Sequence, residues 1–311
     1  MAIGSLFRVF LSRLAAEQVQ QTVADNLRRA AEPKSGSTNP GSTTDTGEHN
    51  DSAQSASATQ ATERELLACH AGIVVALPLE SGYFEDRLSG LISIKGHGFT
   101  MRTGGFAGRG IAVAISGAGQ ERARRATEAL IAGHRPKWLI SAGFAGGLQP
   151  HLARSDIVLA NSVVGEQGQR LSIELGLPTS DERASRGVHV GRLLTVDRII
   201  RKVDEKRSLG ASHGAIAVDM ESLAVAQVCQ CEKQRFLAIR VITDTVNDEL
   251  PRDVERLLNR PTMVRKLGAA TGSIVRRPSA AKDLWKLRES AITAADRLAK
   301  FLVGVIEQLP E

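Results

Sequence analysis

The sequence is poor in aromatic residues and cysteines, and it has no long apolar run. Phe, Trp and Tyr make up 4% of its 311 residues, which argues against a protein that stacks nucleic-acid bases on aromatic rings. Its three cysteines, Cys69, Cys229 and Cys231, are too few and too irregularly spaced for a disulfide framework. No apolar stretch reaches the roughly 18 residues of a membrane-spanning helix. We therefore expect a cytoplasmic protein with no nucleic-acid partner.

The sequence also lacks the common cofactor and metal motifs. Residues 117–119 (GAG) resemble the start of a dinucleotide fingerprint, but Arg122 occupies the position of its third glycine. There is no Walker-type GK[ST] loop. Cys229 and Cys231 are two residues apart on an expected helix, so they do not share a face, and the histidines form no ligand-spaced cluster. We expect neither a cofactor nor a metal.

One apparent nucleophile motif is incomplete. Residues 210–214 (GASHG) match the G-x-S-x-G pattern of a hydrolase nucleophile elbow. That arrangement needs its aspartate and its histidine downstream of the serine, and no histidine follows His213, so the triad cannot be completed in that order. We interpret the segment as a turn.

The chain divides into three parts of different composition. Residues 1–32 have apolar side chains at helical spacing, residues 33–64 are rich in Ser, Thr and Gly, and residues 65–311 have the composition of a folded domain. The middle part is expected to be a disordered linker, because it has almost nothing to bury. The first part is either an amphipathic helix in weak contact with a membrane or a partner, or a helix docked on its own protein, or the result of a misassigned start codon. The net charge of +6 does not by itself indicate a partner.

Short apolar runs alternate with helical stretches in the third part, which predicts a three-layer α/β/α fold with a central mixed, largely parallel sheet. The expected strands are 72–77, 111–116, 138–141, 157–160, 215–218 and 236–243, and the expected helices include 121–132, 221–229 and 279–308.

Polar side chains and glycine-rich turns follow several of these strands. Glu80, Glu221 and Asp244 come at or just after strand ends, and Arg240 lies inside an apolar strand. Residues 116–119 and 141–147 supply bare backbone at two further strand ends. Because the carboxyl ends of parallel strands line the ligand crevice, this pattern suits a sugar-like or anionic ligand.

At these positions the sequence resembles the nucleoside phosphorylase/nucleosidase superfamily, and most closely its 5′-methylthioadenosine/S-adenosylhomocysteine nucleosidase branch. The resemblance runs in order over about residues 70–305, and it is carried by the stretches GIVVALPLE (72–80), SGAGQ (116–120), GFAGGL (143–148), AIAVDMES (215–222) and FLAIRVITDTVN (236–247). It implies cleavage of the bond between a purine and ribose, with a small-molecule purine nucleoside as substrate and a homodimer as the assembly.

The resemblance also implies residue roles. Asp244 falls on the general acid that protonates, or hydrogen-bonds to, the leaving adenine, and Glu80 and Arg240 fall on the pair that holds the nucleophile. Glu221 falls on the acid that binds the ribose hydroxyls, and Met220 packs beneath the sugar. The full set of expected substrate-binding residues is Glu221, Met220, Val218, Phe144, Ala145, Gly146 and Ile199.

The nucleophile separates hydrolases from phosphorylases. Glu80 at the first strand end would repel phosphate but can orient and deprotonate water, which favours hydrolysis. Arg240 could bind phosphate, so phosphorolysis remains the alternative. A metal-independent purine nucleosidase is therefore expected. A non-catalytic nucleoside-binding protein is the alternative from another class.

Three departures from the family pattern bear on the substrate. Phe144 stands where a small serine is usual, Ile199 where an aromatic ring stacks on adenine, and Asn247 where an aspartate is usual. Residues 247–277 and the helix after them also resemble hopanoid-associated members of the superfamily. A phosphorylase or nucleosidase for an adenosylhopane-like lipid, or for another purine nucleoside, is thus a second expectation.

Overall fold

The computed structural model describes residues 69–96, 98–174, 187–251 and 278–310. The expected N-terminal helix (1–32) and linker (33–64) lie outside these ranges. The elements in chain order are β1 (Cys69–Val75), α3 (Pro78–Glu85), β2 (Ser89–Lys95), β3 (Thr100–Phe106), β4 (Arg109–Ile115), α4 (Gln120–His134), β5 (Trp138–Gly147), β6 (Ile157–Gly165), β7 (Arg170–Ser172), β8 (Val188–Thr195), α5 (Val203–His213), β9 (Ala217–Asp219), α6 (Ser222–Cys231), β10 (Arg235–Asp244) and α9 (Pro278–Gln308).

The strands form one mixed sheet that closes on itself at one side. The order is β10-β6-β8-β9-β5-β1-β4-β3-β2, with β7 on β6, and β10 also pairs with β5. The pairings β5–β9, β9–β8, β8–β6, β6–β10 and β10–β5 therefore make a closed ring. The remaining strands extend from β5 as an open sheet that ends at β2.

The central strands are apolar because both of their faces are covered. β1, β4, β5 and β10 pair in parallel and are buried over most of their length, as expected for strands between two helical layers. β2 is exposed along its length, and its Leu91, Ile92 and Ile94 are partly open to solvent. The antiparallel pairs involve hairpins and the strands that close the ring.

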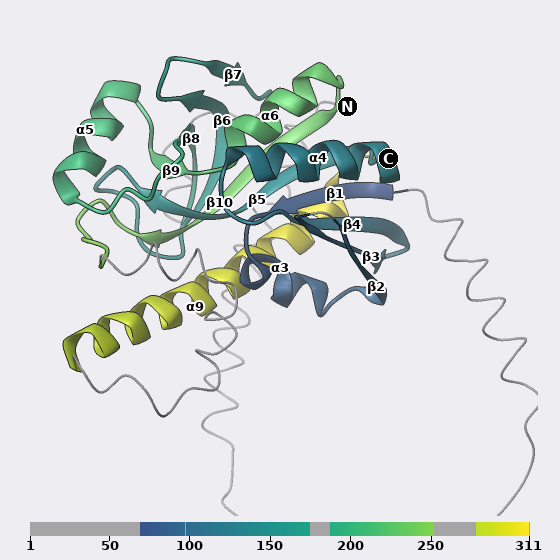
Figure 1. Cartoon of the computed structure of the whole chain (residues 1–311), viewed down its shortest axis with the longest axis horizontal. Coiled ribbons are helices and arrows are strands. Elements are labelled where there is room, and N and C mark those ends of the chain that lie inside the picture. Colours follow the sequence, from purple (N-terminus) through teal and green to yellow (C-terminus); the bar gives the residue numbers. More distant parts are fainter. Residues whose placement is uncertain (1–68, 97, 175–186, 252–277, 311) are drawn as a thin grey trace, which may run out of the picture.

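Helices cover both faces of the sheet (Figure 1). α4 and α6 lie together on one face, and α3 and α9 pack against each other on the opposite face. The C-terminal end of α9 is fixed to the sheet by the Trp138 indole N–H, which donates to the Pro310 carbonyl at 3.1 Å, and by Arg109, which donates to the Ile306 carbonyl. None of the helices in the described ranges is long and apolar enough to cross a membrane.

The three-layer α/β fold predicted from the sequence is confirmed, and so are its six expected strands and three expected helices. Two local predictions are wrong. The glycine-rich segment 141–147 continues β5 because its bare backbone pairs with β10 and β9. Residues 210–214 are the end of α5, whose C-cap is Gly214 in the left-handed region (φ 57°), and do not form an isolated turn.

Candidate active site

Glu80 lies in the first turn of α3 and is held by backbone amides. Its Oε2 accepts hydrogen bonds from the N–H groups of Ala76 (2.8 Å) and Leu77 (2.7 Å), and its Oε1 accepts one from Phe144 (2.8 Å). The side chain is buried, and burial raises its pKa, whereas these amides and the charge of Arg240 lower it. Three donors fix the carboxylate in one orientation at the point where β1 and β5 come together.

Glu221 is a second buried carboxyl, at the start of α6. Its Oε1 accepts from the Gly119 N–H at 2.9 Å, so the glycine turn after β4 contacts it directly. Burial, together with the charges of Asp219 and Glu80, raises the pKa of Glu221 to about 8, while Arg240 opposes this shift. Glu221, Glu80, Asp219 and Arg240 therefore form one electrostatic cluster.

Asp244 ends β10 beside the glycine-rich end of β5. Its Oδ2 accepts a hydrogen bond from the Lys206 ammonium at 2.5 Å, and its Oδ1 accepts one from the Thr243 hydroxyl at 2.9 Å. A Cβ at Gly146 would lie 3.1 Å from Oδ2, so a larger residue there would crowd the carboxylate. Burial raises the pKa of Asp244, and Lys206 lowers it.

Arg240 is buried in the interior of β10 and is paired with Asp219. Its Nε lies 2.8 Å and its Nη2 2.7 Å from Asp219 Oδ2, and Nη2 also donates to the Ser141 hydroxyl at 2.9 Å. Asp219 in turn accepts from Thr195 at 2.6 Å. The guanidinium charge is thus already balanced inside the protein, and most of its directional donors are in use.

The other expected substrate-binding residues line the same edge of the sheet. Phe144 and Gly146 are half-buried near the end of β5, and Met220 is half-buried just after β9. Ile199 is half-buried in the loop after β8. The expected residues Ala145 and Val218 are buried in β5 and β9.

The described structure therefore brings Glu80, Glu221 and Arg240 into one cluster, and Asp244 lies at the end of β10, the strand that also carries Arg240. It gives no contact between Ile199 and these groups. Sequence reasoning missed Asp219 and Lys206, which are the charge partners of the predicted residues. The only sequence signal for Asp219 was its place in the DMES stretch (219–222). Lys206 had no sequence signal, because its partner Asp244 is 38 residues away in the chain.

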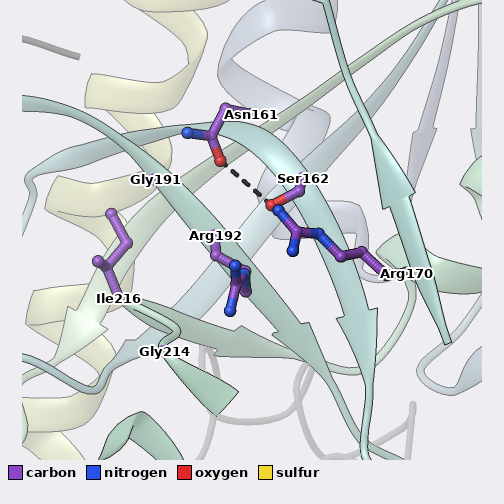
Figure 2. Close-up of a pocket in the computed structure, with 7 residues that line it drawn as sticks. All are labelled: Asn161, Ser162, Arg170, Gly191, Arg192, Gly214 and Ile216. Atoms are coloured by element: carbon purple, nitrogen blue, oxygen red, sulfur yellow. Dashed lines mark hydrogen bonds between the residues drawn. The ribbon is translucent and has the colours of Figure 1, made fainter. Parts of the chain in front are cut away.

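A separate cavity of about 360 Å³ lies between β6, β8 and the end of α5 (Figure 2). Its lining residues are Asn161, Ser162, Arg170, Gly191, Arg192, Gly214 and Ile216. None of them is a predicted site residue, and Arg192 donates to the His213 carbonyl at the C-terminal end of α5 at 2.5 Å. Among the described residues, no group of three or more His, Cys, Asp or Glu side chains is arranged to hold a metal ion.

Comparison with known proteins identifies nucleosidases as relatives. The chain is 26% identical over 209 residues to a 5′-methylthioadenosine/S-adenosylhomocysteine nucleosidase of Tolumonas auensis, a match that covers 60% of this chain and 91% of that protein. It is 26% identical over 210 residues to the nucleosidase of the same name from Staphylococcus aureus, with 61% and 92% covered.

Solved structures share the fold. The Neisseria meningitidis 5′-methylthioadenosine/S-adenosylhomocysteine nucleosidase in complex with methylthio-immucillin-A superposes with a TM-score of 0.59 at 20% identity, covering 77% of this chain and 99% of that one. The futalosine hydrolase of Helicobacter pylori superposes with a TM-score of 0.60 at 19% identity, covering 78% and 99%.

A family sequence model matches most of the domain expected at residues 65–311. The sequence model of the family described as the phosphorylase superfamily matches residues 70–277, which include Glu80, Glu221 and Asp244. Because this match spans more than half of the chain, the protein belongs to the phosphorylase superfamily.

Proposed function

We propose that this protein hydrolyses the N-glycosidic bond of an adenosyl nucleoside and releases adenine. The observation that carries the proposal is the set of three buried carboxyl groups, Glu80, Glu221 and Asp244, at neighbouring strand and helix ends of one sheet edge. Each of them is held by donors from a different part of the chain. Glycosidic cleavage needs groups of this kind, because the leaving base takes up a proton, the sugar hydroxyls need hydrogen-bond partners, and an ionised carboxylate stabilises the positive charge on the sugar in the transition state.

Asp244 acts on the leaving base. A purine departs far more easily when one of its ring nitrogens is protonated or accepts a strong hydrogen bond than when it leaves as an anion. A buried carboxyl whose pKa is raised is suited to this role, since it can carry a proton at higher pH than an exposed aspartate.

Glu221 binds the ribose. Its Oε1 is fixed by the Gly119 amide, and its pKa of about 8 keeps a proton on the carboxyl over much of the neutral range. A protonated carboxyl both donates and accepts hydrogen bonds, which matches a pair of sugar hydroxyls. Met220, the residue before it, is half-buried and supplies an apolar surface beneath the ring.

Water is the nucleophile, and Glu80 orients it. Burial raises the pKa of Glu80, which makes its carboxylate a stronger base for a proton of water, and the three amide donors oppose this shift and favour the ionised form. The ionised form would repel a phosphate dianion. Arg240 offers phosphate little net attraction, because Asp219 already balances its charge. Arg240 therefore acts through the cluster, where its charge lowers the pKa of Glu80 and favours the ionised form.

The 5′ substituent of the nucleoside is proposed to be a thioether, as in 5′-methylthioadenosine and S-adenosylhomocysteine, the substrates in the names of the relatives. Ile199, which is aliphatic and half-buried after β8, stands where the resemblance places a ring that stacks on adenine, so the test should not be limited to 5′-methylthioadenosine. Cytoplasmic location and a homodimer belong to the same proposal.

Mass-spectrometric analysis of adenine release tests the proposal. The purified protein is incubated with 5′-methylthioadenosine, S-adenosylhomocysteine, adenosine and a lipid-linked adenosine, each with and without phosphate. We expect adenine and a free ribose derivative, independent of phosphate. If ribose 1-phosphate forms and its formation depends on phosphate, the protein is a phosphorylase and the hydrolase proposal fails. If nucleosides bind but are not cleaved, the protein is a nucleoside-binding protein and the enzyme proposal fails.

Asp244→Asn provides the matched variant. It should lower kcat by about 10²–10⁴-fold, the usual contribution of general acid catalysis, while nucleoside binding persists. Asp296→Asn, a substitution of the same kind on an exposed acid of α9, is the control and should keep full activity.

A further inference from the structure

Lys206 is a fully buried cation that the proposed reaction does not yet use. Its side chain is 0% exposed on α5, and its Nζ donates to Asp244 Oδ2 at 2.5 Å, to the Thr245 carbonyl at 2.8 Å and to the Asp248 carbonyl at 2.9 Å. Three acceptors need three N–H donors, which only the protonated amine provides. Lys206 is therefore an ammonium ion with a fixed position.

A buried charge of this kind is expensive unless it is paired, and the carboxylate that pairs it is Asp244. Replacing buried ion pairs with apolar residues is often neutral or stabilising, so packing alone gives little reason for a lysine at this point of α5. The pair does, however, connect α5 directly to the group that the proposed function places on the leaving base.

The other groups that face Asp244 do not supply a positive charge. Thr243 donates a hydroxyl to Oδ1, and Asp248 brings a negative charge that raises the pKa of Asp244. Asp248 is itself paired with the exposed Arg154, at 2.8 Å between Oδ1 and Nη2. Lys206 is thus the cation that offsets burial at Asp244.

We propose that Lys206 is a positioning residue for the reaction, which orients the Asp244 carboxyl and tunes the pH at which that carboxyl exchanges its proton. The inference rests on the proposed function. A general acid works best when its pKa is near the working pH, and a carboxyl that burial alone controls would hold its proton too tightly. Lys206 makes Asp244 a stronger acid than burial would allow.

Asp244 takes a proton from solvent and passes it to a purine ring nitrogen while the bond between that purine and C1′ breaks. The electron pair of this bond goes to the purine, and the oxygen of water forms the new bond to C1′ while one proton of that water passes to the Glu80 carboxylate. Lys206 keeps its three protons throughout and stabilises the Asp244 carboxylate left behind.

Lys206→Gln and Lys206→Arg separate charge from hydrogen bonding. For Lys206→Gln we expect the limb of the kcat/KM profile set by Asp244 to move to higher pH by about one unit or more. The maximum should fall by about 10–10²-fold through kcat with little change in KM, as for a misplaced catalytic group. Lys206→Arg restores the charge and should return the limb toward that of the wild type. Lys300→Gln, on an exposed pair of α9, is the control.

An unmoved limb in a folded Lys206→Gln protein, with activity retained, would overturn the inference and leave the nucleosidase proposal intact. A second measurement does not require any Lys206 variant to fold. The ¹³C carboxyl signal of Asp244, assigned by its loss in Asp244→Asn, is followed with pH in the wild type. If the Asp244 carboxyl titrates in the neutral range or below it, the inference is supported. If the chemical shift stays at its protonated value throughout that range, the inference is overturned.

If the wild type cleaves no nucleoside, adenine binding replaces turnover. The affinity for adenine is then measured against pH by calorimetry in the wild type and in Lys206→Gln. A shift of its pH dependence between the two proteins supports the role of Lys206 even though the enzymatic proposal has failed, and identical dependences overturn it.

Discussion

Glu221 is buried beside negative charge, and this has a consequence for stability that a single substitution can isolate. Its pKa is raised from 4.5 to about 8 in the folded protein, so the folded state holds a proton that the unfolded chain has lost. The contribution of this group to stability is fully present below pH 4.5 and is lost as the pH rises through about 8.

We therefore expect Glu221→Gln to flatten the pH dependence of the free energy of unfolding across that window. Urea unfolding of the wild type and the variant at several pH values measures it. Glu128→Gln, an exposed side chain on α4, is the matched control. Parallel curves for wild type and Glu221→Gln would contradict the expected shift.

A methyl group added at Gly143 should displace Glu80, a residue of the candidate active site. A Cβ there would lie 2.7 Å from Glu80 Oε1, closer than real contacts allow, so the carboxylate must move off its amide donors. We expect Gly143→Ala to lower kcat/KM by about 10²-fold, since small displacements of a positioned group cost that much. Adenine release measures the effect.

Gly133→Ala is its control, because nothing lies within 4 Å of the added methyl group and the residue is inside α4. This control should keep full activity and stabilise the protein by up to about 1 kcal/mol. Equal activities of the two variants would mean that Glu80 does not need its observed position.

At the level of whole elements, α5 ends in a conformation that favours glycine. Gly214 has φ 57°, and an added Cβ would lie 2.9 Å from Arg192 Nη1. We expect Gly214→Ala to lower the free energy of unfolding by about 1–2 kcal/mol. Gly214→Asn should cost less, because asparagine tolerates the left-handed region. Thermal and urea unfolding compare the two, and equal losses would assign the cost to the contact with Arg192.

The sequence predicts best the elements whose environment is uniform. β1, β4 and β10 are buried on both faces, so their apolar runs stand out, and α9 carries a long apolar stripe. Other elements escaped prediction because their side chains are polar or mixed. β2 is exposed throughout, and α5 buries only Lys206 and Gly210, neither of which gives a helical apolar period.

The candidate site shows the same division. Glu80, Glu221 and Asp244 could be proposed because strand ends gather at one edge of a parallel sheet. The pairing of Arg240 with Asp219 could not, since it depends on which strands become neighbours when the ring closes. This pairing changes the interpretation of Arg240 from a free cation for phosphate to a neutralised part of the scaffold.

At the scale of the whole molecule, the C-terminal helix α9 belongs to the same hydrophobic core as the central sheet. Phe301 is 1% exposed and packs in the main hydrophobic cluster with strands of both halves of the sheet. We expect Phe301→Ala to lower the free energy of unfolding by about 3–5 kcal/mol, the usual cost of deleting a buried ring. Urea unfolding followed by circular dichroism measures this loss.

The matched control is Ile94→Ala on the exposed edge strand β2, where the side chain is 59% exposed and little burial is lost. If α9 were an independent unit, Phe301→Ala would produce a separate early transition. We expect one cooperative transition instead, seen at the same midpoint in the near and far ultraviolet.

The attachment of the chain end to Trp138 gives the protein an internal optical reporter. The indole is 3% exposed, donates to the Pro310 carbonyl, and lies under the Arg235 guanidinium at 5.3 Å. The chain has two tryptophans, so Trp285→Phe leaves a single emitter in the core. Its fluorescence should lie at short wavelength in the native state and shift to the red when water reaches the indole. Release of the last residues of the chain could then be followed in real time, separately from loss of secondary structure.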